Sequence, residues 1–544
     1  MTRSIRLRPW QKAALEKFVA GGSDDFLAVA TPGAGKTTFA LTAARHVLAE
    51  DPRRRLVVVA PTAHLKLQWA AAAARFSLHL DPAWSAADGR LPADMHGIVT
   101  TYQQVASSAA VLQDLARGAF VVFDEIHHAG DDRAWGESVR VAFQRADRRL
   151  AISGTPFRSD TRAIPFVRYV LDEAAPDFEY GYGEALADRR VVRPIYFPRT
   201  NGQMEWTAPD GSLQSASFDD ALDQARSSQR LRTALSLDGE WLPTVLRQAV
   251  GQLESLRETQ SDAGGLVIAI DQEHARGIVE MLRNRFGQEA VLVTSDDSGS
   301  SDRIARFAAS SDPWLVAVRM VSEGVDIPRL RVGVYATTTT TELFFRQAVG
   351  RFVRWTPGVK DQKAFLFIPD DPRLRTRAFQ LADQRRHSLR RREQERVERD
   401  PAELDTGEEE QLSLFAALSA VATDHQTHAT WDGDMVDDDL EGLYDDPSLE
   451  LTLAPPPPLA GERRSLDDMG VTFGGDASRT RRQEKKRLRE RNAEVVLAIA
   501  RRTGQSHAQV NAELNRQSGV GRITEATVAQ LQRRLEVGER MARR

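Results

Sequence analysis

The sequence predicts an α/β protein with two tandem parallel-sheet domains, and two observations predict it. Short, continuous apolar runs alternate with helical patterns over residues 1–195, as in sheets buried on both faces, and the alternation resumes at Gly265. A glycine-rich loop also stands between an early apolar run and a helical stretch. We therefore predict a first domain over residues 1–195. A second domain is predicted over residues 196–372, with a small hairpin and a helix at its entry.

The glycine-rich loop is the strongest single motif. It reads ATPGAGKT over residues 30–37, directly after the apolar run 26–30. Its glycines let backbone N–H groups approach phosphate oxygens, and the following helix N-terminus favours the anion. The lysine is expected to reach the β- and γ-phosphates, and the threonine after it to place its hydroxyl on Mg²⁺. The expected nucleotide-binding residues here are Gly33, Gly35, Lys36, Thr37 and Thr38.

An acidic pair follows another apolar run. Residues 119–123 lead into Asp124 and Glu125, at the end of a predicted parallel strand, where α/β sheets bind ligands. Asp124 is expected to hold Mg²⁺ through water, and Glu125 to orient and deprotonate the attacking water. A strand-end pair that only caps the next helix is the alternative, and the glycine-rich loop disfavours it. His128 is expected to be a solvated neighbour of His127 without a role.

Together the loop and the acidic pair resemble those of superfamily 2 helicases and translocases. The likeness continues over residues 6–355 and implies RecA-like motor domains that bind ATP and Mg²⁺ between them. Arg8 and Gln11 lie in a segment that resembles the adenine-reading motif. Gly324 and Asp326 lie in a motif of the second motor domain and are expected at the nucleotide. The segments that resemble nucleic-acid-contacting and coupling motifs contribute Pro61, Thr62, Thr100, Thr101, Ser153, Thr155 and Gln347.

Two arginines, Arg351 and Arg354, end the last of these motifs. Negative charge builds on the γ-phosphoryl oxygens in the transition state, and an arginine finger that neutralises it is worth ~10³–10⁵ in rate. Residues three apart share one helical face, so both side chains can point at the same place. They are therefore expected to be catalytic, together with Lys36 and Glu125. The alternative is a pair of surface arginines.

Two further segments indicate the kind of motor. The acidic motif reads DEIH and the coupling motif SGT, where RNA-remodelling DEAD-box proteins read DEAD and SAT. Residues 178–187 and 191–194 resemble the group that contains XPB-like helicases, RadD-like repair helicases and restriction-enzyme motor subunits. This resemblance implies an ATP-dependent DNA helicase or translocase in bacterial or phage DNA repair or replication. An RNA-remodelling helicase and the motor subunit of a restriction or defence system remain alternatives, and a decayed, non-enzymatic tether is disfavoured by the intact catalytic residues.

The composition limits the kinds of site and the cellular compartment that are possible. The chain has 544 residues and no cysteine, which excludes disulfides and cysteine zinc sites. It has neither a long apolar run nor the apolar core of a signal peptide, so we predict a cytoplasmic protein. The net charge of −4 conceals an uneven distribution, because residues 400–450 hold 16 acidic and no basic residues and the rest carries +12. A basic excess suits a phosphate-backbone binder, although ordinary surface charge can produce it.

The chain changes character after residue 372. Residues 373–399 are rich in arginine at helical spacing, which indicates either a nucleic-acid-tracking helix or a solvated one. Residues 400–480 are acidic and contain four consecutive prolines, so we predict a disordered linker. Residues 481–544 regain helical periodicity and predict a small helical module.

One short segment of that linker resembles the pentapeptide by which bacterial proteins dock on the DNA polymerase sliding clamp. It reads QLSLF, and the residues expected to bind the clamp are Gln411, Leu412, Leu414 and Phe415. An extended chain can present the leucine and the phenylalanine to an apolar pocket, with the glutamine hydrogen-bonding at its edge. The alternative is a stretch of amphipathic helix.

Overall fold

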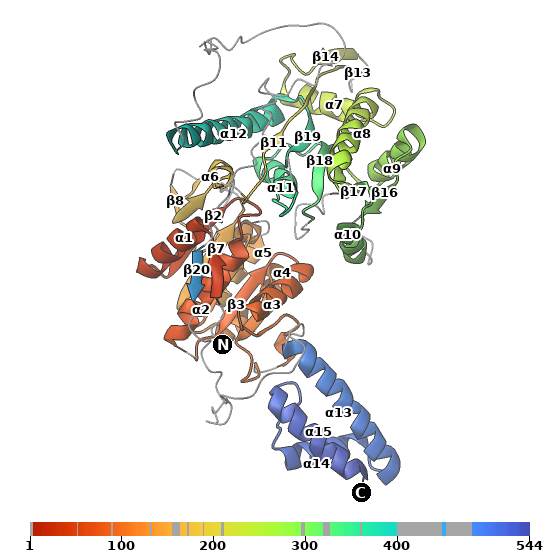
Figure 1. Ribbon diagram of the computed structural model, residues 1–544. Coiled ribbons are helices and arrows are strands. Elements are labelled where there is room, and N and C mark those ends of the chain that lie inside the picture. The colour runs from red at the N-terminus through yellow and green to blue at the C-terminus, as the bar shows by residue number, and fades with distance from the viewer. Residues whose placement is uncertain are drawn as a thin grey trace. The chain divides into compact units, whose positions relative to one another are not determined.

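The computed structural model places most of the chain in helices, strands and short connections (Figure 1). The residues that it describes are 4–51, 53–88, 91–130, 133–154, 164–170, 173–188, 190–207, 212–294, 300–318, 327–359, 362–399, 449–452 and 481–543. Two compact units are present. The first contains Met1–Ala30, Gly35–Glu179 and Asp446–Arg544, and the second contains Thr31–Ala34 and Tyr180–Asp445. The chain thus enters the second unit at Tyr180, whereas the sequence places the domain boundary after residue 195.

The first unit is built on a seven-stranded sheet in the order β10-β2-β7-β6-β3-β5-β4. The strands are β2 (Asp25–Ala30), β3 (Leu56–Ala60), β4 (Leu80–Asp81), β5 (Gly97–Thr101), β6 (Phe120–Asp124), β7 (Arg148–Ser153) and β10 (Phe178–Tyr180). Each neighbouring pair from β2 through β4 is parallel. The carboxyl ends of β2, β7, β6, β3 and β5 therefore follow one another along one edge of the sheet.

Helices connect these strands. They are α1 (Pro9–Ala20), α2 (Lys36–Glu50), α3 (Ala63–Arg75), α4 (Tyr102–Leu115) and α5 (Arg133–Phe143), with short 3₁₀ turns at Ala86–Asp88 (η1) and Ile126–Gly130 (η2). Thr62 caps α3 by accepting from Leu65 N at 3.4 Å, and Thr101 caps α4 by accepting from Gln104 N at 3.2 Å. Since Ala60 pairs with Thr101 across β3 and β5, these two helices begin side by side.

Two short antiparallel pairs complete the strands of this unit. Strand β8 (Tyr169–Val170) pairs with β9 (Glu173–Ala174), and β1 (Ser4–Leu7) pairs with β20 (Leu449–Thr452). Strand β20 lies inside the range predicted to be a disordered linker, so that prediction is wrong for its four residues. The alternating sequence LELT suits a strand once β1 supplies backbone partners, which the segment lacks by itself.

The second unit contains a second parallel sheet, in the order β11-β19-β18-β15-β17-β16, with β12 also pairing with β19. Its strands are β11 (Ile195–Tyr196), β12 (Arg199–Thr200), β15 (Gly264–Ala269), β16 (Ala290–Val293), β17 (Trp314–Val318), β18 (Leu330–Tyr335) and β19 (Ala364–Pro369). An antiparallel hairpin, β13 (Gln203–Thr207) with β14 (Leu213–Ser217), follows β12. The four central strands β15, β17, β18 and β19 are buried along their whole length.

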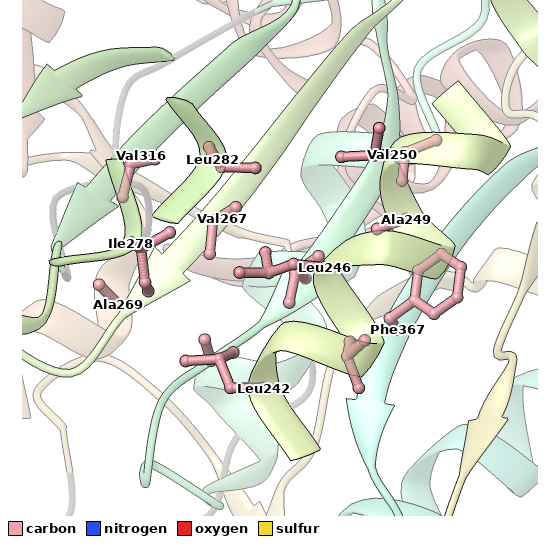
Figure 2. Close-up of a cluster of buried hydrophobic side chains, with 14 of the residues drawn as sticks. Leu242, Leu246, Ala249, Val250, Val267, Ala269, Ile278, Leu282, Val316 and Phe367 are labelled. Atoms are coloured by element: carbon pink, nitrogen blue, oxygen red, sulfur yellow. The ribbon is translucent and has the colours of Figure 1, made fainter. Parts of the chain in front are cut away.

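The core of this unit forms where helices cover the second sheet. The helices are α6 (Tyr182–Ala187), α7 (Gln224–Ala234), α8 (Trp241–Thr259), α9 (Gln272–Phe286), α10 (Ser300–Ala309), α11 (Glu342–Phe352) and α12 (Pro372–Arg399). Figure 2 shows Leu242 and Leu246 of α8 among Val267 of β15, Ile278 of α9 and Phe367 of β19. Leu242 and Leu246 on α8, like Ile278 and Leu282 on α9, are four residues apart, which gives each helix one apolar face.

Three helices end the described chain: α13 (Arg481–Thr503), α14 (His507–Ser518) and α15 (Val528–Arg543). Arg534 of α15 is buried among them and donates to the side-chain oxygens of Asn492, Asn511 and Asn515 at 2.9, 2.6 and 2.8 Å. Burial lowers the pKa of Arg534. The module is attached to the rest of the first unit at the buried Asp94, which pairs with Lys485 and accepts from Val528 N at 2.9 Å.

The predicted fold class is confirmed. Two parallel-sheet units of the RecA-like kind are present, and the end of the described chain is a helical module. Among the described helices, none is both long and apolar enough to cross a membrane.

Candidate functional site: an ATPase centre at the carboxyl edge of the first sheet

The glycine-rich loop has the backbone that its sequence predicts. Gly33 and Gly35 have φ values of +85° and +92°, in the left-handed region that favours glycine. A Cβ on Gly35 would also lie 2.7 Å from Nε2 of Gln11, so a side chain there would displace this amide from its bond to Gly35 O. Lys36 starts α2 directly after this turn, with Thr37 and Thr38 in the same helical turn. Its Nζ donates to Ala30 O at 3.3 Å, which folds the lysine back over the loop.

Gln11 holds the loop from the side of α1. Its Nε2 donates to Gly35 O at 2.9 Å and its Oε1 accepts from Arg8 N at 2.8 Å, while only 3% of the residue is exposed. The segment that resembles an adenine-reading motif is therefore bonded to the phosphate-binding loop. The adenine contact of Gln11 and Arg8 stays a prediction.

Glu125 faces Lys36 across the sheet edge. Its Oε1 lies 3.2 Å from Lys36 Nζ, and its Oε2 accepts from Gly154 N at 2.8 Å and from Ser153 Oγ at 3.3 Å. Burial by itself would raise the pKa of Glu125, but the charge of Lys36, then His127 and the Gly154 N–H, lower it to about 2. Its backbone has φ +47°, a left-handed conformation that is uncommon for non-glycine residues.

Asp124 lies deeper than its neighbour. It is 9% exposed and its Oδ2 accepts a hydrogen bond from the indole Nε1 of Trp69 at 2.7 Å. Burial, followed by the negative charge of Glu125, raises the pKa of Asp124 to about 6, although the Trp69 hydrogen bond opposes the rise. The hydroxyl of Tyr102 donates to the backbone oxygen of Asp124 at 2.9 Å. Asp124 is thus the more basic member of the pair.

The two histidines after this pair are both buried. His127 Nδ1 lies 3.3 Å from Ser153 Oγ and 3.6 Å from Glu125 Oε2, so the histidine links the acidic motif to the SGT segment. His128 is 8% exposed and packs against the rings of His127 and Tyr102. The expectation that His128 is solvated is wrong, because the 3₁₀ turn η2 directs it back over α4.

The residues fit a nucleotide with a divalent metal. The described part of the chain contains no cluster of three or more His, Cys, Asp and Glu residues that could hold a metal. Mg²⁺ at phosphoryl-transfer sites is usually held by one or two carboxylates, waters and the substrate phosphates instead of a protein cage. Asp124, a buried carboxylate fixed by one donor, and Thr37, in the first turn of α2, match that donor set. When bound, the metal would neutralise phosphate charge.

The residues expected to contact nucleic acid occupy the next strands along the same edge. Pro61 and Thr62 follow β3, and Thr100 and Thr101 end β5. Lys66 of α3 donates to Gln104 of α4 at 2.6 Å, so the two helices are tied beside their N-termini. Ser153 ends β7, between the loop and the acidic pair.

The remaining predicted residues lie in the second unit or outside the described residues. Gln347 and Arg351 are on α11 of the second unit. The expectation that Arg351 and Arg354 share one helical face is wrong, because α11 ends at Phe352 and Arg354 forms a β-bridge with Val192. Thr155, Gly324, Asp326 and the clamp-binding residues Gln411, Leu412, Leu414 and Phe415 lie outside the described residues. The roles proposed for all of them stay predictions.

Three side chains of this centre were given no role of their own from the sequence, although two of them stand in its motifs: Trp69, Tyr102 and His127. A signal for Trp69 was available, because Thr62, Lys66 and Trp69 are spaced by four and three residues and so share one helical face. No comparable pattern marks Tyr102, since its hydroxyl reaches a backbone atom in another strand.

Comparison with known proteins finds similarity to restriction enzyme subunits. Residues 4–158 match the family described as "Type III restriction enzyme, res subunit". The chain is 22% identical over 395 residues to the type I restriction enzyme EcoKI endonuclease subunit of Escherichia coli strain K12, covering 65% of this chain and 33% of that protein. A solved fragment described as an HsdR subunit of a type I restriction enzyme from Vibrio vulnificus gives a TM-score of 0.47 at 17% identity, over 68% of this chain and 65% of that one.

Residues 4–158 of the first unit are thus similar to restriction enzyme subunits, and this similarity indicates an ATPase-type motor. A relative along the whole chain is protein MT2985 of Mycobacterium tuberculosis strain CDC 1551 / Oshkosh, 40% identical over 556 residues, covering 97% of this chain and 92% of that protein. Protein ML1624 of Mycobacterium leprae is equally 40% identical, over 559 residues, 97% of this chain and 93% of that protein. The chain belongs to the family of these mycobacterial proteins.

Proposed function

We propose that this protein is an ATP-dependent motor that moves along DNA. The observation that carries the proposal is the order of groups on one sheet edge. The phosphate-binding loop, Ser153, the acidic pair and two helix N-termini follow one another along the carboxyl ends of neighbouring strands. Hydrolytic groups and groups able to hold a phosphate backbone thus share one rigid layer.

The ATPase half rests on Lys36 and Glu125. A carboxylate with a pKa of about 2 is a weak base, and the charge of Lys36 is the largest effect that lowers it. When Lys36 turns to a nucleotide phosphate instead, Glu125 loses that charge and becomes a stronger base for a water proton. The lysine therefore keeps the base inactive until the substrate engages it. Arg351 and Arg354 are proposed to stabilise the charge that develops on the γ-phosphoryl group.

The DNA half rests on the N-termini of α3 and α4. The first-turn N–H groups of a helix favour an anion, and two such ends lie side by side, capped by Thr62 and Thr101. Contacts of this kind hold a phosphate backbone without reading bases, which a motor requires. DNA is favoured over RNA because the matching family and the E. coli relative are both named as restriction enzyme subunits. Nothing in these relatives supports a role in DNA repair, so a restriction or defence motor is the preferred setting.

The test is an ATPase measurement with single-stranded DNA, duplex DNA and RNA of equal length. We expect DNA to raise the rate and RNA to leave it near the unstimulated value. Displacement of a triplex-forming strand from duplex DNA then reports translocation, with Lys36→Ala as the inactive control. Stimulation by RNA alone would replace the proposal with an RNA-remodelling helicase, and absence of stimulation by any nucleic acid would reject a nucleic-acid motor.

A further inference from the structure

Asp124 receives hydrogen bonds from two different helices. Trp69 of α3 donates to its carboxylate at 2.7 Å, and Tyr102 of α4 donates to its backbone oxygen at 2.9 Å. Trp69 is 2% exposed and Tyr102 is fully buried, so water does not replace either donor. Both bonds end on the residue that is expected to hold the metal. Each donor comes from a different neighbouring strand–helix connection.

These are the helices whose N-termini are proposed to hold the DNA backbone. Trp69 lies two turns along α3 from its cap Thr62, on the same face as Lys66. Tyr102 is the first residue of α4, directly after its cap Thr101. The bond from Lys66 to Gln104 at 2.6 Å joins the first turns of the two helices. A shift of either helix on binding a phosphate backbone therefore reaches Asp124 through one side chain.

We propose that Trp69 and Tyr102 are positioning residues that transmit DNA binding at α3 and α4 to the ATPase centre. The inference rests on the proposed function. Trp69 fixes the orientation of the Asp124 carboxylate, which would hold the metal, because an indole N–H can only donate and its hydrogen bond weakens steeply when misaligned. Tyr102 fixes the carbonyl of Asp124, which belongs to the peptide that leads into Glu125.

Tyr102 acts on the strained backbone of Glu125. Glu125 has φ +47°, and such a conformation persists only where its surroundings hold it. Tyr102 is one of the groups that hold it, because it fixes the peptide plane before Glu125. The two donors thus have separable effects: Trp69 acts on the metal-holding carboxylate, and Tyr102 acts on the backbone of the catalytic base. DNA that engages α3 and α4 improves both alignments and raises the hydrolysis rate.

The test compares Trp69→Phe and Tyr102→Phe with wild type in the full-length protein. Each substitution removes one donor and keeps an aromatic ring. The measured quantities are the ratio of DNA-stimulated to unstimulated ATPase rates and the Mg²⁺ concentration that gives half the maximal rate. We expect both variants to lower the ratio by about tenfold, the loss typical of one hydrogen bond to a charged or strained group. Only Trp69→Phe is expected to raise the half-saturating Mg²⁺ concentration.

Gln113→Leu is the matched control. Gln113 lies on α4 and donates to Val141 O at 3.0 Å, so its loss removes a hydrogen bond from the same helix without affecting Asp124. We expect this variant to keep the wild-type ratio and Mg²⁺ requirement. The inference is overturned if wild type is stimulated by DNA and both phenylalanine variants are stimulated equally well. It is also overturned if they lose both rates in proportion with a lowered melting temperature, which is the pattern of a purely structural role. A wild type without DNA stimulation rejects the proposed function instead.

Discussion

The substitution Glu125→Gln separates nucleotide binding from hydrolysis. Glutamine has nearly the same shape and keeps an oxygen that can accept from Gly154 N, the 2.8 Å bond of the wild type. It cannot take a proton from water. Loss of a general base costs about 10²–10⁴ in rate, so the turnover number should fall by at least about 100-fold. ATP affinity should stay the same or rise, because one negative charge leaves the neighbourhood of Lys36 and the phosphates.

The cost to stability can be bounded from the pKa. The pKa of Glu125 falls from 4.5 to about 2 in the folded protein, which corresponds to roughly 3 kcal/mol of favourable interaction with the ionised form. A carboxyl with a lowered pKa stabilises the fold above its unfolded pKa, and this stability is lost as the pH falls toward 2. Glu125→Gln therefore removes at most about 3 kcal/mol at neutral pH, or about 10 °C in melting temperature for a unit of this size.

The assay therefore measures both the loss of turnover and the loss of stability. Steady-state ATPase and equilibrium nucleotide binding are measured at 25 °C, with a thermal scan to show that the variant is folded under the same conditions. A folded Glu125→Gln protein that hydrolyses ATP at the wild-type rate would refute the assignment of the base. A folded variant that no longer binds ATP would show that Glu125 builds the binding site instead of activating water.

Three further predictions concern other parts of the chain. Arg351→Ala should lower DNA-stimulated turnover by about 10³-fold or more while ATP affinity changes little. Loss of ATP affinity with an unchanged turnover number would show that Arg351 contacts ATP in the ground state instead. Burial lowers the pKa of His274, whose Nε2 lies 2.8 Å from Leu235 O, so the thermal stability should be full above about pH 6.5 and fall below it by up to about 1.4 kcal/mol per pH unit. The variant His274→Asn should flatten this profile. A wild-type stability that does not change from pH 7 to pH 5 would contradict the prediction. A peptide of residues 400–425 should bind the bacterial sliding clamp, and it should lose measurable binding when Leu414 and Phe415 become alanine, since such anchors typically contribute ~2 kcal/mol or more each. Equal binding of the two peptides in a titration would favour the alternative, that this segment is a stretch of amphipathic helix.

Local chemistry explains why so much of the ATPase centre could be predicted. Gly35 needs a positive φ and an approach too close for a side chain, and both demands are visible as a glycine in a strand–loop–helix setting. The acidic pair is recognisable because it ends a buried parallel strand. The strand β20 was missed for the opposite reason: its partner β1 is more than 400 residues away, and no local pattern encodes such a pairing.

The sequence by itself determined the two α/β units, the phosphate-binding loop and the acidic pair, because a short run of residues is enough to specify the local conformation of each. Only the tertiary structure decided how the pair is tuned. Burial acts on both carboxylates, but the pKa of Glu125 falls because Lys36, at the start of the helix that follows β2, faces it, while burial prevails at Asp124 and raises its pKa. The donors Trp69 and Tyr102 likewise reach Asp124 from separate helices. Charge and hydrogen bonding act over a few ångströms in space, and the fold alone sets which distant residues come that close.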